Sequence, residues 1–295
     1  MIVATYNCSR ALKCALQSLL NQGYQDFEAW VIGDCCTDDS EAVVSAVGDP
    51  RLHWTNLPRR VGFSYGPHNE GLRRAQRKYS AYLGHDDLWF PWHLATLVKT
   101  IEQTQADFAY AAVVLMGPSG PVRACGASGA EKYGHRSSTP PSTWLHRREI
   151  VEQCGEWRRP EEYAGCFQSQ AFSAGLRHAA SEEFSVIKFP AYLWHIYALD
   201  DGHPQPGYLA RMEADPHRLL HELLSPLTFE SLDLESGGCS GEVYRPPGFE
   251  NGLPRNQVAP TGLVRCGTMP VSRYMIRHTA YWHKRALAQR GLPDA

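Results

Sequence analysis

The chain has 295 residues, of which 43% are hydrophobic and 20% are charged, and its formal net charge is −2. This composition is ordinary for a globular protein with a hydrophobic core, and the charge balance does not favour nucleic acid or an anionic membrane as a partner. No apolar run approaches the ~20 residues that span a bilayer and no charged-then-apolar signal peptide opens the sequence, so we expect a cytoplasmic protein without a transmembrane segment.

Short apolar runs alternate with amphipathic segments in the first part of the chain. Runs that are typical of buried strands lie at residues 1–5, 27–33, 51–55, 80–84 and 107–116. Segments with helical spacing or helix-start signals lie between them, at residues 9–20, from about residue 38, at 69–79 and at 91–101. Strands that alternate with helices predict an α/β domain with a doubly wound, mostly parallel, Rossmann-like sheet flanked by helices.

The second part of the chain is less regular. Residues 117–141 are rich in Gly, Ser and Pro, which predicts a loop. Residues 147–155 and 167–176 have helical patterns, and residues 184–192 resemble a strand. After residue 200 the periodicity breaks up, and residues 236–270 are dominated by Gly, Pro and short polar runs.

These patterns divide the chain into two regions. We expect one domain at residues 1–200, made of a half at 1–115 and a half at 116–200, and an irregular or helical C-terminal extension of unknown role at 201–295. Residues 272–290 are basic and amphipathic. We expect that segment to dock on the body of the protein or on a second subunit, which would give a homodimer.

Polar side chains follow three of the predicted strands. They are Thr5, Tyr6 and Asn7 after the first strand, Asp34 after the second, and Asp86 with Asp87 after the fourth. In an open α/β sheet, ligands bind beyond the carboxyl ends of the strands, near a switch in strand order. We therefore expect these side chains to form one site.

The adjacent carboxylates of Asp86 and Asp87 have three plausible uses. They could bind a divalent cation through oxygen ligands, with a diphosphate supplying the remaining oxygens. They could act as an acid and a base with separated pKa values. They could also cap the following helix and pair with nearby arginines, which is the ordinary structural interpretation of an isolated Asp-Asp pair.

Four motifs, in order and with family-like gaps, resemble family 2 glycosyltransferases of the GT-A fold. They are VATYN at 3–7, VIGDCCTDDS at 31–40, HNEGLRRA at 68–75 and YLGHDDLWFP at 82–91. The resemblance covers residues 1–115 well and continues more loosely to residue 191. It implies a nucleotide-binding half at 1–115, an acceptor-side half at 116–200, and inverting transfer of a sugar from a nucleotide-diphospho-sugar, with a UDP-sugar favoured.

The same resemblance assigns roles to the residues that contact the donor. It implies that Thr5, Tyr6 and Asn7 line the pocket for the base and ribose. Asp34 would hydrogen-bond the base, and Asn69 would lie near the ribose and the phosphates. The acceptor is not specified beyond a glycan, a natural product or a peptide.

The fourth motif concerns the diphosphate. The resemblance implies that Asp86 and Asp87 hold Mn or Mg on the diphosphate, with Asp86 also contacting the sugar nucleotide. Gly84, however, stands where the family pattern D-x-D-D has its first aspartate. Lys188 is either a second diphosphate contact or a surface lysine, and His85 is either structural or a phosphate or metal contact.

The catalytic base is the least defined part of the pattern. Where relatives have an aspartate, residues 165–168 contain no carboxylate, and a neutral Cys or Gln cannot act as a conventional carboxylate base. Glu161 and Glu162 lie just upstream, and either could deprotonate the acceptor. Both could equally be solvated charges of a loop.

Two other functions compete with sugar transfer. The altered D-x-D-D motif and the missing base favour a sugar-nucleotide-binding protein that has lost catalysis and serves as a scaffold. A diphosphate site of the same kind could also support redirected chemistry, such as nucleotidyl transfer.

Overall fold

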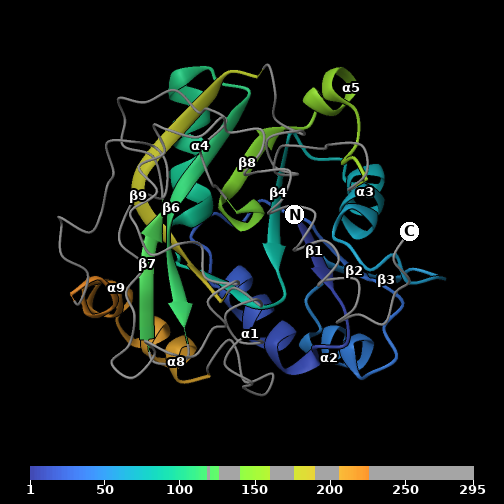
Figure 1. Ribbon diagram of the computed structural model, residues 1–295, viewed down its shortest axis with the longest axis horizontal. Helices are drawn as coiled ribbons and strands as arrows, with labels where there is room; N and C mark the ends of the chain where they lie inside the picture. The colour runs from blue at the N-terminus through green and yellow to red at the C-terminus, as the bar shows by residue number, and fades with distance from the viewer. Residues whose placement is uncertain (118–119, 126–139, 160–175, 190–205, 226–295) are drawn as a thin grey trace, which may run out of the picture.

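The computed structural model describes residues 1–117, 120–125, 140–159, 176–189 and 206–225. Within these ranges the strands form a nine-stranded mixed sheet, with helices packed against it (Figure 1). The α/β class that the alternation of strands and helices predicts is confirmed. Among the described residues, no helix has both the length and the apolar character needed to cross a membrane.

The N-terminal half of the sheet is parallel. It follows the order β3-β2-β1-β4. The strands are β1 (Ile2–Thr5), β2 (Ala29–Gly33), β3 (Leu52–Asn56) and β4 (Tyr79–Gly84). The helices between and beyond them are α1 (Ser9–Leu20), α2 (Ser40–Val47), α3 (Tyr65–Arg74) and α4 (His93–Thr104). Each predicted strand of this half therefore exists. After β3 the chain crosses to the other side of β1, where β4 pairs, so the strand order switches direction there.

The other half of the sheet mixes antiparallel and parallel pairs. From β4 the order continues β8-β6-β9-β5, and β7 pairs with the free part of β6. The strands are β5 (Asp87–Trp89), β6 (Phe108–Gly117), β7 (Gly120–Cys125), β8 (Trp144–Arg147) and β9 (His178–Lys188). Only β6 and β9 run parallel among these described pairs, so the sheet is less parallel than the sequence predicts.

Neighbouring residues of β1 point to opposite faces of the sheet, as the two-residue period of a strand requires. Val3 belongs to the core that includes Leu16 of α1 and Leu97 of α4. Ile2 belongs to the core on the other face, with Leu72 of α3. Helices therefore cover both faces, which explains why the parallel strands read as continuous apolar runs.

The remaining short elements lie around the second half of the sheet. They are η1 (Pro141–Thr143), α5 (Ile150–Cys154), α8 (Pro206–Ala214) and α9 (Pro216–Leu224). In Figure 1, α8 and α9 lie together below β7, and a third core joins Leu209 and Leu219 to Phe189 at the end of β9. The region after residue 200 thus contains two helices, within the extension that the sequence predicts to be irregular or helical.

Some element boundaries differ from those expected. The helix predicted at 69–79 begins at Tyr65 and ends at Arg74, and its Gly71 packs directly on β1: a Cβ at Gly71 would lie 2.5 Å from Ile2 Cγ2. The loop predicted at 117–141 contains β7. The helix expected at 167–176 lies almost wholly outside the described residues, and the segments at 236–270 and 272–290 lie entirely outside them.

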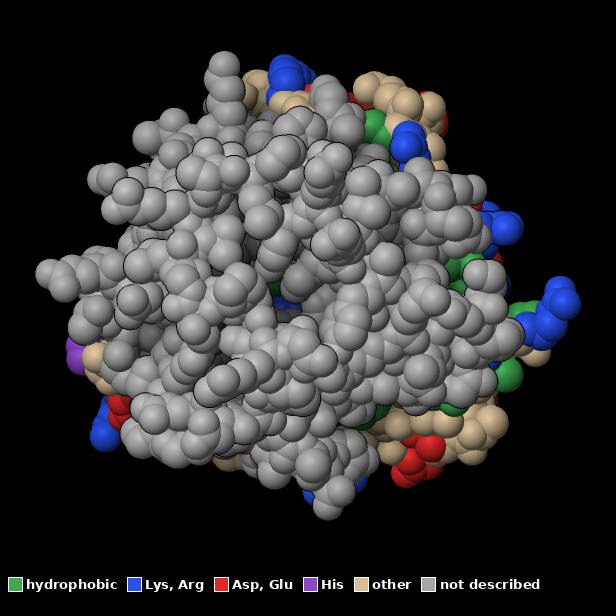
Figure 2. Space-filling view, in the orientation of Figure 1, with side chains coloured by type: hydrophobic (Ala, Val, Ile, Leu, Met, Phe, Trp, Pro, Cys, Tyr) green, Lys and Arg blue, Asp and Glu red, His purple; other side chains and the backbone are tan. Residues whose placement is uncertain are grey.

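Charged side chains of both signs are interspersed along the rim of the described part of the molecule in the space-filling view (Figure 2). On that rim, the described lysines and arginines do not gather into a single basic surface. This distribution agrees with the nearly neutral composition of the chain.

Candidate functional site

The carboxyl ends of β1, β2 and β4 lie level with one another. Thr5 pairs with Gly33 of β2, and Ala4 pairs with Gly84 of β4. Backbone bonds continue this alignment past the strands, because the Asp34 N–H donates to the Thr5 carbonyl oxygen at 2.8 Å. The side chains that the sequence places after these strands therefore meet at one edge of the sheet, as predicted.

Asp34 is a buried carboxylate that holds the loop after β3. Its Oδ1 accepts from the Val61 N–H and its Oδ2 from the Gly62 N–H, both at 2.7 Å. Gly62 has a left-handed φ of 80°, which brings the two successive amides toward one carboxylate. A carboxylate oxygen has two acceptor directions, so each oxygen of Asp34 can accept one further hydrogen bond.

The polar residues after β1 form the rest of this corner. Tyr6 carries the guanidinium of Arg60 over its ring, 4.0 Å from the ring centroid. Asn7 adopts a left-handed φ of 43°, accepts from the Thr37 N–H at 2.8 Å and donates to the Thr37 hydroxyl at 3.3 Å. These contacts tie the ends of β1 and β2 together.

Thr5 has an unsatisfied hydroxyl. The residue is 2% exposed, and its Oγ1 has no hydrogen-bond partner among the described residues. A buried hydroxyl without a partner costs free energy of folding, on the order of 1–3 kcal/mol. A bound ligand that hydrogen-bonds Thr5 would remove this cost, so the orphan hydroxyl favours a ligand at this edge.

Asp87 lies below the surface of the site. It is fully buried, and its carboxylate accepts from Lys188 Nζ at 2.9 and 3.2 Å, from the Phe189 N–H at 3.2 Å, and from the Ser142 hydroxyl. The pairing of β5 with β9 sets Asp87 directly opposite Lys188. Burial raises the pKa of Asp87, and the Lys188 ammonium opposes this shift by favouring the ionised form. Asp87 thus joins β5, β9 and η1.

Asp86 is the more exposed carboxylate of the pair. A Cβ atom at Gly84 would lie 2.9 Å from Asp86 Oδ1 and 3.0 Å from Asp87 Oδ2, so the two carboxylates crowd the same glycine. An aspartate at position 84 would meet both of them. The absence of a side chain at Gly84 is therefore a packing requirement of this arrangement as well as a departure from the family pattern.

His85 lies between Gly84 and Asp86 and is turned toward β1. Its Nδ1 is 3.2 Å from the Ala4 carbonyl oxygen. Burial disfavours the charged form of His85, but the Cys8 side chain and the Asp86 carboxylate favour it more strongly, and the pKa of His85 rises to about 9. His85 is therefore a structural contact of β1 that also places positive charge beside Asp86.

The residues present do not fit a divalent-cation site built on both carboxylates. Mg and Ca ions take six or more oxygen ligands, and carboxylates are their usual protein ligands. All the donors on Asp87 come from the protein, and no group of three or more His, Cys, Asp or Glu side chains in the described part of the chain could hold a metal ion. Of the two carboxylates, Asp86 is the one left to contact a cation.

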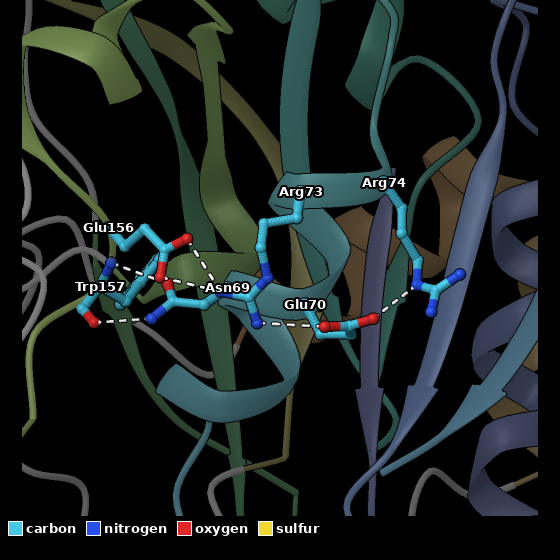
Figure 3. Close-up of polar contacts among 6 residues, drawn as sticks. All are labelled: Asn69, Glu70, Arg73, Arg74, Glu156 and Trp157. Atoms are coloured by element: carbon cyan, nitrogen blue, oxygen red, sulfur yellow. Dashed lines mark hydrogen bonds and ion pairs between the residues drawn. The ribbon is translucent and has the colours of Figure 1, made fainter.

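Asn69 clamps two parts of the chain together (Figure 3). Its Nδ2 donates to the Trp157 carbonyl oxygen at 2.9 Å, and its Oδ1 accepts from the Trp157 N–H at 2.8 Å. Beside it, Arg73 pairs with Glu156 and Glu70. Because both ends of the Asn69 amide bond the backbone, this residue positions the segment around Trp157, and a contact with ribose stays a prediction.

A cavity of about 370 Å³ opens beside Asn69, between α3 and residues 156–159. Its lining includes three arginines and one glutamate, so the wall carries net positive charge: Arg73, Arg158, Arg159 and Glu156. An anionic group would fit such a wall better than a cationic one. Glu161 and Glu162, the candidate bases, lie outside the described residues.

The sequence does not indicate four contacts of this site. The backbone amides of Val61 and Gly62 donate to Asp34. Backbone donors cannot be recognised from residue types, apart from the glycine at position 62. Ser142 and Lys188 reach Asp87 from 55 and 101 residues away, which no local pattern indicates. The sequence predicts Lys188 only as a diphosphate contact or a surface lysine, and it does not indicate the pairing with Asp87.

Comparison with known proteins agrees with this geometry. Residues 1–122 match the family model described as Glycosyl transferase family 2, so the family resemblance of the four motifs is confirmed over this part of the chain. The glucosyltransferase WfaP of Escherichia coli, described as UDP-Glc:alpha-D-GlcNAc-diphosphoundecaprenol beta-1,3-glucosyltransferase, is 27% identical over 110 residues, which is 37% of this chain and 43% of WfaP.

Two further proteins are similar. The succinoglycan biosynthesis protein ExoO of Rhizobium meliloti is 32% identical over 108 residues, 37% of this chain and 31% of ExoO. The chain thus spans less than half the length of WfaP and ExoO. The crystal structure of S. aureus TarS 1–349 superposes with a TM-score of 0.52 at 18% identity, covering 79% of this chain and 74% of that one, which confirms the GT-A-type fold.

Proposed function

We propose that this protein is a glycosyltransferase that moves a sugar from a nucleotide-diphospho-sugar to an acceptor, with a UDP-sugar as the favoured donor. The observation that carries the proposal is the level alignment of β1, β2 and β4, which brings Asp34 and Asp86 to one edge of the sheet. The family match over residues 1–122 supports the same activity.

The donor base would lie in the corner formed after β1 and β2. A uracil N–H would donate to Asp34, whose oxygens each retain one acceptor direction beside the loop amides. The Tyr6 ring, on the face away from Arg60, would provide a stacking surface, and the orphan hydroxyl of Thr5 would provide a hydrogen bond. Contacts of Asn7 and Asn69 with the ribose would require their present bonds to Thr37 and Trp157 to change.

The transfer step follows from the chemistry of the donor. The acceptor nucleophile attacks the anomeric carbon, the bond from that carbon to the diphosphate oxygen breaks, and the nucleotide diphosphate leaves with the electron pair. Attack from the opposite face inverts the anomeric configuration. The acceptor proton passes to a general base, for which Glu161 and Glu162 are the candidates. Asp86 is the described carboxylate nearest the surface of the site.

Of the Asp86-Asp87 pair, a divalent cation, Mn or Mg, would find only Asp86, because donors of the protein occupy Asp87. No step of the transfer is therefore assigned to a cation. We also propose a domain boundary near residue 200 and a homodimer contact through residues 272–290.

A donor panel tests the proposal directly. The protein is incubated with UDP-, GDP- and dTDP-sugars, and release of the nucleotide diphosphate is measured. We expect release from one donor class and a loss of at least tenfold in Asp34→Asn, because a base contact to a charged acceptor contributes roughly 1.5–3 kcal/mol. Arg77→Gln is the control, since Arg77 is exposed and pairs with Asp26 near the amino ends of β4 and β2, away from the carboxyl ends that form the site.

The alternatives predict different products. A scaffold protein, which Gly84 favours by removing one carboxylate of the motif, would bind the nucleotide without releasing a diphosphate from any donor. A nucleotidyl transferase would release pyrophosphate from a nucleoside triphosphate instead. Binding of no nucleotide in any form would contradict all three functions.

A further inference from the structure

We propose that Lys188 of β9 supplies the positive charge that contacts the donor diphosphate, in the place where the D-x-D-D pattern implies a cation held by both aspartates. The inference rests on the proposed function, because it assigns a contact within the same donor site. It has three structural supports: the donors on Asp87, the position of Lys188 beside Gly84, and the different exposure of the two charges.

The first support is that Asp87 has no acceptor direction left for a metal. A carboxylate offers about four lone-pair directions. Lys188 Nζ lies within hydrogen-bond distance of both oxygens, the Phe189 N–H bonds Oδ1, and the Ser142 hydroxyl bonds Oδ2. A cation at Asp87 would have to break an ion pair inside the protein and displace a hydroxyl that is itself bonded by the Gly84 N–H at 3.1 Å.

The second support is the position of the ammonium. Lys188 Nζ is 2.9 Å from Asp87 Oδ2, and that oxygen is 3.0 Å from the point where a Cβ at Gly84 would lie. Asp86 Oδ1 is 2.9 Å from the same point. Through Asp87, the Lys188 charge therefore lies near the carboxyl end of β4, which Gly84 closes, and this is where the family pattern implies the diphosphate.

The third support is the orientation of the pair. The Asp87 side chain is 0% exposed, whereas the Lys188 side chain is 23% exposed. The pair is thus asymmetric: its carboxylate is fully buried, whereas the side chain that carries its ammonium keeps some exposure. A charge-assisted contact from an ammonium to a phosphate oxygen forms without displacing Asp87, because the carboxylate remains behind it.

Asp87 has a role that depends on Lys188. The register of β5 and β9 holds Asp87 opposite Lys188, so Asp87 is a positioning residue that acts through the lysine. Because position 84 is a glycine, the site has one carboxylate fewer than the D-x-D-D pattern. It also has one ammonium, that of Lys188, close to the two carboxylates that remain, Asp86 and Asp87.

The test compares UDP with uridine, which differ only in the diphosphate, by isothermal titration calorimetry in EDTA and again in Mn. We expect wild-type protein to bind UDP more tightly than uridine in EDTA. Lys188→Met should weaken UDP binding about 10- to 100-fold, the range for a lost contact to a charged group, and should leave uridine binding unchanged. Asp87→Asn/Lys188→Met, in which no unpaired buried carboxylate remains, controls for folding, and its UDP affinity should match that of Lys188→Met.

Each outcome of this comparison decides the proposal. It is overturned if the preference for UDP over uridine exists only in Mn, or if Lys188→Met lowers the affinities for UDP and uridine equally. It is also overturned if the variants retain native melting temperatures and wild-type UDP affinity. Failure of the proposed function would look different, because neither UDP nor uridine would then bind the wild-type protein in EDTA or in Mn.

Discussion

Asp87 and Lys188 form the most consequential ion pair of the described site. The carboxylate is fully buried, and the lysine is partly buried opposite it. Breaking such a pair by removing one partner leaves an uncompensated charge, at a cost of about 3–5 kcal/mol. Partial exposure of Lys188 places the expected value at the low end of that range.

We therefore expect Asp87→Ala to lower the free energy of unfolding by about 3 kcal/mol, measured by urea denaturation. Asp86→Asn, which changes the more exposed neighbour, should lower it by less than about 1 kcal/mol. Asp87→Leu/Lys188→Met should recover most of the loss, because an apolar pair replaces both charges. Equal effects of Asp87→Ala and Asp86→Asn would show that the pair does not have the role given to it here.

Substitution of Gly84 tests how the number of carboxylates in the D-x-D-D segment affects the site. Gly84→Asp restores the first carboxylate of the D-x-D-D pattern but sets it about 3 Å from two others. We expect this variant to melt several degrees below wild type in EDTA and to be stabilised by Mn more than wild type is. Gly84→Ala adds the same Cβ without the charge, and it should show no such response to Mn.

The comparison of Gly84→Asp with Gly84→Ala has two possible outcomes. A larger stabilisation by Mn in Gly84→Asp than in Gly84→Ala supports like-charge crowding as the reason for the glycine. Identical melting curves of these variants, with and without Mn, would contradict it and leave steric contact as the whole effect.

At the scale of elements, a hydrogen-bonded network joins β4, β8 and the segment after α5. The Trp157 Nε1–H donates to the Tyr82 hydroxyl at 3.0 Å, and this hydroxyl lies 2.8 Å from His146 Nε2. His146 Nδ1 is 2.8 Å from the Arg147 carbonyl oxygen, so Nδ1 carries the proton and Nε2 accepts from Tyr82. Asn69 anchors the same segment from α3 through the Trp157 backbone.

Asn69→Ala should release this segment. Two buried backbone groups of Trp157 would lose their partners, and we expect the free energy of unfolding to fall by about 2–4 kcal/mol in urea denaturation. Arg73→Gln is the matched control one turn along α3, because Arg73 is half exposed and its pairs with Glu70 and Glu156 should contribute less than about 1 kcal/mol. A loss in Asn69→Ala no larger than in Arg73→Gln would contradict the clamp.

The elements that sequence patterns predict are those whose signal is local. The strands β1 to β4 are short apolar runs between polar ends, and the polar ends locate Asp34 and Asp86 correctly at one edge. The antiparallel half depends on pairings between distant segments, such as β5 with β9, which no window along the chain can show. The helix α9 did have a local signal, because Asp215 caps it by accepting from the Arg218 N–H and Pro216 occupies its first position.

For the candidate site, the sequence predicts which strand ends carry polar residues, but it does not predict what those residues contact. The motif indicated Asp87, but the strand that brings Lys188 to it begins far along the chain. Asn69 was expected at the donor because its motif resembles a donor motif. The structure shows that its amide bonds Trp157, a partner 88 residues away.

At the scale of the whole molecule, buried histidines link stability to pH. Burial lowers the pKa of His68 and of His93 to about 3. Burial also lowers the pKa of His146, to about 4, although its bond to the Arg147 carbonyl opposes the shift. All three histidines are therefore neutral in the folded protein, whereas in the unfolded chain a histidine titrates near pH 6.5.

The sign of the pH effect follows from these lowered values. The stabilisation is complete above about pH 6.5 and is lost as the pH falls toward 4, because the unfolded chain binds protons first. We expect a loss of roughly 1 kcal/mol per histidine for each pH unit in that window, measured as the melting temperature between pH 7.5 and 4.5. His93→Gln should reduce the slope, and exposed His221→Gln should not. A constant melting temperature across the window would contradict the assignment.

The central claim is that the aligned ends of β1, β2 and β4 bind a sugar nucleotide. Calorimetric titration of the full chain with UDP tests this claim most directly, with Asp34→Asn as the site variant and exposed Asp26→Asn as the matched control. The account predicts saturable UDP binding by wild type and Asp26→Asn, weakened at least tenfold in Asp34→Asn, since the base would lose a charged acceptor. UDP affinity that is unchanged in a natively folded Asp34→Asn protein would contradict it.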